Sequence, residues 1–228
     1  MKNPTIYLGN LRVDEPVTML TDVLVAAVCI YAFFKLRPLA DRTRQHRLLL
    51  MFFLFMGVAT FLGGVLGHGF TYTVGLYAKL PGWLISMLAV NFVERSMILY
   101  TSDVVNDKVD RFFSVFNIIE LLTFAGLAFG TLNFLWVEVH STYGFLIVVF
   151  GLALLNYIKG KKTKQIKLIM WAVGSIFICS VVFVAKIAPD KWFTHADLAH
   201  VFMAIGAFLF YKAARLILIE TKNNPDSV

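Results

Sequence analysis

Charged residues are scarce in this chain of 228 residues. Asp, Glu, Lys and Arg together make up 15% of the sequence, and 59% of the residues are hydrophobic. A soluble domain usually carries about 25% charged residues. The mean hydropathy is +0.75. This composition excludes an ordinary soluble domain and is typical of an integral membrane protein with several spans.

Other features that would point to a function are also missing. The sequence has no Gly-rich phosphate loop, Walker pattern or nucleophile elbow. The two cysteines, Cys29 and Cys179, lie in apolar segments, so we expect buried free thiols and no disulfide. Residues 1–16 lack the apolar core of a cleavable signal peptide, so we expect the first span to act as its own insertion signal.

Long apolar segments dominate what is present. Each approaches the roughly 20 residues that a helix needs to cross a bilayer, and only short connections separate them. We therefore predict an all-α fold, a single seven-helix transmembrane domain over residues 1–228, with a short fifth span. The predicted spans are residues 17–34, 48–71, 83–100, 112–137, 143–157, 166–184 and 196–218.

The distribution of positive charge predicts the orientation. Fifteen of the 21 Lys and Arg residues flank one side of the predicted bundle, five flank the other, and Arg95 lies within a span. Cytoplasmic connections are enriched in Lys and Arg, so we predict an external N-terminus and a cytoplasmic C-terminus. Because the net charge of +7 lies mostly in short connections, it favours contact with anionic lipid headgroups and not with nucleic acid.

The start of the last span carries an unusual group of polar residues, Phe193-Thr194-His195-Ala196-Asp197-Leu198-Ala199-His200. Ionisable residues within a span are costly and are by default candidates for function. On a helix, Asp197 and His200 lie about 60° apart on one face, whereas His195 lies about 140° from His200. A pair of ligands at Asp197 and His200 is one interpretation. A capping aspartate beside an interfacial histidine is the alternative.

The first two spans bring further polar groups to the same predicted depth. In span one, Glu15 and Asp22 lie about 20° apart around a helix and Thr18 lies near them, so we expect one helix face to carry all three. Helix capping would explain Glu15 but not Asp22, which lies about 10 Å further along. Span two ends in a Gly-rich stretch that carries His68.

Imidazole and carboxylate groups gathered in one layer are the ligand types that zinc prefers. We predict His68 and His200 as metal ligands, with Asp197 as the third and Asp22 as the alternative third ligand. In the catalytic interpretation, Glu15 or Asp22 transfers protons. His195 and Thr18 are expected to support the ligands from outside.

A second polar set lies deeper in spans three and four. It includes Glu94, Arg95 and Glu120. We expect Arg95 to pair with one of the glutamates in a structural ion pair, and a path for protons or ions is the alternative. Of the other histidines, we expect His46 to be a solvated loop residue and His140 to lie at the interface.

Three short motifs resemble the CREST superfamily of seven-span membrane hydrolases, which contains the alkaline ceramidases and the adiponectin/progestin receptors. Glu15-Pro16-Val17-Thr18-Met19-Leu20-Thr21-Asp22 is similar to the start of the first ceramidase span. Gly64-x-x-x-His68, followed by Leu80-Pro81, resembles the Ser-x-x-x-His and Leu-Pro of that family. Ala196-x-x-x-His200 falls where the family has His-x-x-x-His.

The departures from the family pattern limit what the resemblance implies. Gly64 stands in place of the family serine, Ala196 in place of a histidine, and Tyr77-Ala78-Lys79 in place of an aspartate. The resemblance implies a zinc-dependent hydrolase of a lipid amide or ester, as a divergent member in a bacterial plasma membrane, with membrane lipids and a lipid-like substrate as partners. The alternative is a receptor-like or lipid-binding protein with a structural or empty metal site.

Overall fold

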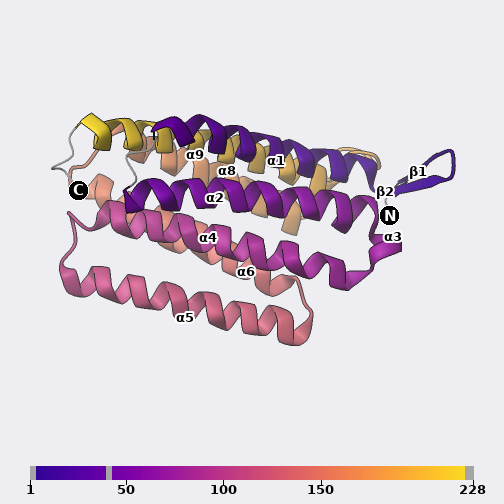
Figure 1. Ribbon diagram of the computed structural model, residues 1–228, viewed down its shortest axis with the longest axis horizontal. Helices are drawn as coiled ribbons and strands as arrows, with labels where there is room; N and C mark the ends of the chain where they lie inside the picture. The colour runs from indigo at the N-terminus through magenta and orange to yellow at the C-terminus, as the bar shows by residue number, and fades with distance from the viewer. Residues whose placement is uncertain (1–3, 40–42, 224–228) are drawn as a thin grey trace.

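The protein is a bundle of long helices that lie side by side (Figure 1), described here from a computed structural model that covers residues 4–39 and 43–223. Seven helical stretches in these residues are long and apolar enough to cross a membrane. In chain order the elements are β1 (Thr5–Leu8), β2 (Leu11–Asp14), α1 (Pro16–Leu36), η1 (Arg37–Leu39), α2 (Arg44–Leu62), η2 (Gly63–Gly69), α3 (Thr71–Val74), η3 (Leu76–Lys79), α4 (Leu80–Thr101), α5 (Asp107–Thr131), α6 (Leu135–Tyr143), η4 (Gly144–Val149), α7 (Phe150–Ile158), α8 (Lys164–Val184) and α9 (His195–Asn223).

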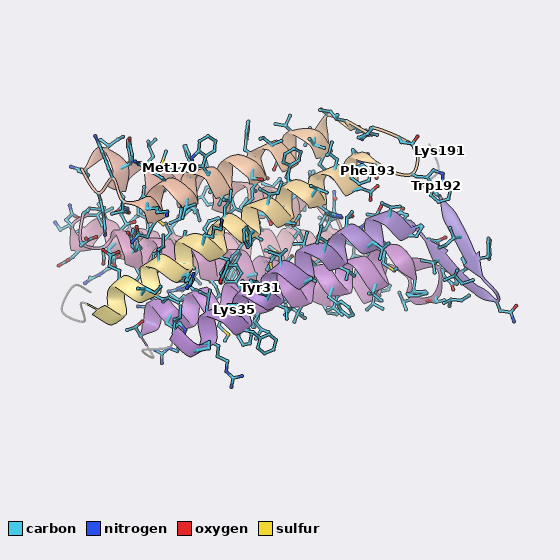
Figure 2. All side chains as sticks on the ribbon, turned by 90° about the horizontal axis from the view of Figure 1, so that it is seen from above. Tyr31, Lys35, Met170, Lys191, Trp192 and Phe193 are labelled. Carbon is cyan, nitrogen blue, oxygen red and sulfur yellow. The ribbon has the colours of Figure 1, made fainter. Side chains whose placement is uncertain are left out.

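The two ends of the bundle differ in character. At one end, which we call the hairpin end, the β1–β2 hairpin projects beyond the helices (Figure 1). The connection between α8 and α9, with Lys191, Trp192 and Phe193, lies at this same end (Figure 2). The opposite end, the basic end, holds the starts of α2, α5 and α8 and most of the Lys and Arg residues.

Helix packing divides the bundle into a main body and one peripheral helix. Helix α1 packs against α2 and α9, α8 packs against α9, and α2 packs against α4. The rings of Phe52, Phe145 and Phe210 meet at the centre with centroid separations of 5.8–6.4 Å. Helix α5 packs chiefly along α4 and α6, and it runs along the edge of the bundle (Figure 1).

The boundary between the fourth and fifth spans differs from the predicted one. Helix α5 ends at Thr131, where Leu132 adopts a left-handed conformation with φ 51°, and α6 begins at Leu135. The fifth span therefore runs over 24 residues, Leu135–Ile158, and is not short. The apolar run continues through the turn, so hydrophobicity alone could not reveal the break.

The N-terminal hairpin was not predicted from the sequence. Strands β1 and β2 pair antiparallel with Thr5 opposite Asp14. The Arg12 guanidinium donates a hydrogen bond to Asp14, 2.8 Å away, and this bond holds the pKa of Asp14 below its usual value and raises the pKa of Arg12. The same guanidinium lies 5.0 Å from the centre of the Tyr72 ring, which attaches the hairpin to α3.

Candidate metal centre

The turn into α1 places Glu15 at the hairpin end of the bundle. Pro16 occupies the first turn, where a helix needs no backbone N–H from it. Glu15 precedes the helix in a left-handed conformation, φ 46° and ψ 52°, and its backbone N–H donates to the carbonyl of Pro4. Its side chain makes no capping hydrogen bond and reaches His68 instead.

A π-helical segment, η2, carries His68 towards α1. Such segments interrupt α-helices, frequently at functional sites. Within η2, Gly64 allows an unusually close approach, because a Cβ atom there would lie 2.8 Å from Asp22 Cβ and 3.0 Å from the Met19 carbonyl oxygen. Asp22 therefore occupies the space that any side chain at position 64 would require.

Two imidazoles converge on the carboxylate of Asp22. His68 Nε2 lies 3.8 Å from Asp22 Oδ2, and His200 Nε2 lies 3.4 Å from Asp22 Oδ1. The centres of the two imidazole rings are 6.2 Å apart. Three helical segments, α1, η2 and α9, thus contribute one side chain each to a single cluster, which we call the Asp22 cluster.

The outer nitrogen of each imidazole has its own partner. His68 Nδ1 lies 2.5 Å from Glu15 Oε2, and His200 Nδ1 lies 3.0 Å from Thr21 Oγ1. The Thr21 hydroxyl donates its hydrogen to the Thr18 carbonyl, so it accepts from His200 Nδ1–H. Neutral His200 then carries its lone pair on Nε2, facing Asp22. Hydrogen bonding of His68 Nδ1 to a carboxylate favours the same tautomer for His68.

The side chains of the Asp22 cluster and its neighbour Glu15 differ in exposure. The side chains of His68 and Glu15 are 31% and 29% exposed, whereas those of Asp22 and His200 are 9% and 12% exposed. The cluster is therefore reached past His68 and Glu15, from the hairpin end. Two lone pairs and a carboxylate that face one another at this depth repel unless a proton or a cation lies among them.

The remaining predicted site residues lie elsewhere around the cluster. Asp197 is fully buried, its Oδ2 accepts a hydrogen bond from the Thr194 backbone at 2.5 Å, and its Oδ1 has no hydrogen-bond partner in the described part of the chain. Asp197 interacts electrostatically with Asp22 and His200. His195 packs its ring against Phe183, with the centroids 5.3 Å apart.

The contribution of span one differs in detail from the expected one. Thr18 is buried and acts through its backbone carbonyl, whereas the neighbouring Thr21 contacts His200. The sequence reasoning missed Thr21, although its position one residue before Asp22 was a usable signal. Across residues 4–39 and 43–223, no group of three or more His, Cys, Asp or Glu side chains is already close enough to hold a metal ion. The wide separation of the two rings leaves the Asp22 cluster incompletely closed.

The deeper polar set is arranged differently from the prediction. Arg95 forms no ion pair within the described ranges, and Glu120 instead lies 2.6 Å from His140 Nδ1. His140 is fully buried and not interfacial, because the fifth span begins before it. His46 is also buried, with Nε2 3.2 Å from the Leu36 carbonyl, and is not a solvated loop residue.

The fold and the Asp22 cluster define a seven-helix bundle of the membrane-protein type with an acid–imidazole cluster at one end. The chain belongs to the family of unknown function DUF6962, whose model matches residues 17–218. The matched segment includes Asp22, His68 and His200 and begins two residues after Glu15. No curated protein and no solved structure gives a significant match to the chain.

Proposed function

We propose that the protein is a zinc-dependent membrane hydrolase that cleaves an amide or ester bond of a lipid, as a divergent relative of the CREST superfamily. One observation carries the proposal. The Nε2 atoms of His68 and His200 face the two oxygens of the Asp22 carboxylate. The Nδ1 atom of each ring is hydrogen-bonded on the opposite side, to Glu15 and to Thr21 respectively. Metal-binding histidines are usually oriented in this way by an acceptor on the second ring nitrogen.

The spacing of Asp22 and the two imidazoles is compatible with a tetrahedral zinc site after a small inward movement of the side chains, since the described residues do not yet close around an ion. Zinc bonds to imidazole nitrogen and carboxylate oxygen measure about 2.0–2.1 Å, so two ligand atoms of a tetrahedral site lie roughly 3.3–3.4 Å apart. The separations of 3.4 and 3.8 Å from the Asp22 oxygens to the two imidazoles are close to that spacing. His68, His200 and Asp22 would therefore hold the ion. The third ligand in this proposal is Asp22, the alternative named from the sequence, and not Asp197.

The two carboxylates would then have different roles. A zinc ion supplies a Lewis acid that polarises a carbonyl and lowers the pKa of water towards neutrality. Asp22 is nearly buried and holds both imidazoles in place. Glu15 is more exposed and already accepts the Nδ1 proton of His68. Glu15 would act as the proton carrier between water and the leaving nitrogen or oxygen, and because it lies across the imidazole from Nε2 it would do so through a bridging water or after its carboxylate turns towards the ion.

The position of the cluster supports a lipid substrate. Leu20, next to Thr21 and Asp22 on α1, is 61% exposed, and Leu24 one turn further on is 46% exposed. In a membrane these side chains, on the face of α1 opposite Asp22, would contact lipid at the depth of the cluster. A lipid at this depth would then reach the cluster past His68 and Glu15. In this proposal the hairpin end lies at the outer face of a plasma membrane and the C-terminus in the cytoplasm, and the excess of Lys and Arg at the other end favours this orientation.

Metal analysis of the purified protein tests this proposal. We expect close to one zinc ion per chain, and we expect His68→Ala and His200→Ala each to abolish binding. Asp22→Ala should lose the metal as well. Asp197→Ala is the matched control, and it should retain zinc with an affinity lowered by about 10–100-fold, as for the loss of a supporting group.

Activity of the same proteins is then measured on lipid amides and esters in mixed micelles. Glu15→Gln should retain zinc and lose turnover. Stoichiometric zinc that survives both histidine substitutions would contradict the ligand assignment. A folded wild-type protein that binds no zinc would support the receptor-like alternative.

A further inference from the structure

A second cluster of ionisable side chains is buried in the other half of the bundle. It consists of residues from α4, α5 and α6 that share no member with the Asp22 cluster, and we call it the inner cluster: Asn91, Glu94, Asn117, Glu120 and His140. Glu94 and His140 are 0% exposed, and Glu120 is 5% exposed. Ionisable groups buried in membrane-spanning helices are rare and usually belong to pathways for protons, ions or substrates.

One side of the inner cluster is a chain of amide hydrogen bonds. Asn91 Nδ2 donates to Asn117 Oδ1 at 2.8 Å, and Asn117 Nδ2 donates to Glu94 Oε2. The second oxygen of Glu94, Oε1, is buried and has no hydrogen-bond partner in the described part of the chain. No Lys or Arg of the described residues forms an ion pair with Glu94 or Glu120.

The other side is a pair that shares one proton. His140 Nε2 lies 3.1 Å from the Met87 carbonyl, which can only accept, so Nε2 carries a hydrogen. His140 Nδ1 lies 2.6 Å from Glu120 Oε1, and a bond of this length requires one hydrogen between the two atoms. Whether this hydrogen belongs to Glu120 or to His140, the pair has no net charge. Glu120 Oε2 is buried without a partner.

The backbone of the fifth span makes room for the unpartnered oxygen of Glu94. A Cβ atom at Gly144 would overlap sterically with Glu94 Oε1, so the side chain of any other residue would displace this carboxyl group. Gly144 begins the π-helical segment η4, and segments of this kind are frequently found at functional sites. Tyr143, the residue before it, interacts electrostatically with both Glu94 and Glu120.

The cost of burying a net charge indicates the protonation state of Glu94. An ionised Glu94 would be a buried negative charge without a cation, which is strongly unfavourable in an apolar interior. A proton on Glu94, with one more shared by Glu120 and His140, leaves the cluster neutral. Moving the Glu94 proton to Glu120, with the shared proton on His140, conserves both the proton count and the zero net charge.

We propose that the inner cluster is a membrane-embedded proton-binding site. Glu94 is the carboxyl group that gains and loses the proton, and the Glu120–His140 pair is the group that exchanges a proton with it. Among the described residues, the ionisable side chains that interact electrostatically with Glu94 are Glu120 on α5 and Tyr143 on α6, and His140 on α6 reaches the cluster through Glu120. This inference is independent of the proposed hydrolase function.

Infrared difference spectroscopy of the purified protein at pH 7 tests the proposal. The wild-type protein should show the carbonyl absorption of a protonated carboxylic acid, shifted in heavy water, and Glu94→Gln should lose this absorption. Because glutamine resembles the neutral acid, Glu94→Gln should unfold at a temperature equal to or above that of the wild type. Glu138→Gln, two residues from His140 and only half-buried, is the matched control and should keep the absorption.

Three results would overturn the proposal. The first is that Glu94→Gln removes carboxylate absorption and leaves the acid absorption intact. The second is that sodium chloride in place of choline chloride removes the acid absorption, which would make the cluster a sodium site. If Glu94→Gln does not fold, Glu94→Asp should shift the acid absorption, and an unshifted absorption is the third.

Discussion

Replacing Gly64 with alanine should separate α1 from η2. The new Cβ atom would lie 2.8 Å from Asp22 Cβ, a distance that real Cβ atoms do not adopt, and 3.0 Å from the backbone oxygen of Met19. Neither neighbour is the end of a flexible side chain, so the two segments must move apart. Overpacking of this kind usually costs about 1–3 kcal/mol of folding free energy.

The same displacement moves Asp22 relative to both imidazoles. If Asp22 binds the metal, the displacement should weaken zinc binding by about 10–100-fold, the typical effect of disturbing the support of a ligand. Gly64→Ser, which restores the hydroxyl of the CREST pattern, should have the same effect because its Cβ atom meets the same neighbours.

Thermal unfolding in detergent and competition with a zinc chelator measure the two effects. Gly126→Ala is the matched control, because this exposed glycine on α5 has nothing within 4 Å of its added Cβ atom. The free energy of unfolding of Gly126→Ala should rise by up to about 1 kcal/mol, because alanine has a higher helix propensity than glycine. If Gly64→Ala and Gly126→Ala were equally stable and bound zinc equally well, the close approach of Asp22 to η2 would be refuted.

Two further predictions concern orientation and the inner cluster. A reporter at the C-terminus should be cytoplasmic and one inserted in η3 (Leu76–Lys79) external, because fifteen Lys and Arg residues flank the predicted cytoplasmic side of the bundle and five flank the other. An external C-terminal reporter would contradict this orientation. His140→Ala should lower the free energy of unfolding by about 1–3 kcal/mol, since it leaves the buried carboxyl group of Glu120 without its hydrogen-bond partner. Arg95→Ala should lower the free energy of unfolding by less than about 1 kcal/mol, since Arg95 has no ion-pair partner among the described residues. Equal losses of stability for His140→Ala and Arg95→Ala in reversible unfolding experiments would contradict this prediction.

The sequence predicts the spans well because a span needs only length and hydrophobicity. It does not predict the end of α5, since Leu132 sits in an apolar run and only its left-handed backbone ends the helix. That one turn moves His140 from a predicted connection into the buried interior. The hairpin escaped prediction because its two strands have only four residues each and are attached through contacts such as that of Arg12 with Tyr72.

The candidate site was partly predictable for a similar reason. Depth along each helix follows from counting residues, which is why His68, His200 and Asp22 were all assigned to one layer. Rotation about each helix depends on packing, and it determines that Asp22 lies between the imidazoles while Asp197 bonds to the Thr194 backbone. The helical spacing used for Glu15 does not apply, because Glu15 precedes the helix.

The two π-helical segments have a consequence for how this sequence tolerates change in length. A π-turn contains one residue more than an α-turn, so η2 and η4 each hold a residue that a regular helix would not accommodate. A π-turn absorbs its extra residue locally, so deleting one residue from η2 would let the segment close into a regular α-helix while the residues beyond it keep roughly their present face. His68 would then still point towards Asp22. A deletion in a regular α-helical part of the same span would instead turn every residue beyond it by about 100°. When the chain is aligned with other members of its family, a single-residue gap within η2 or η4 is therefore compatible with the same cluster, whereas a gap elsewhere in these spans is not.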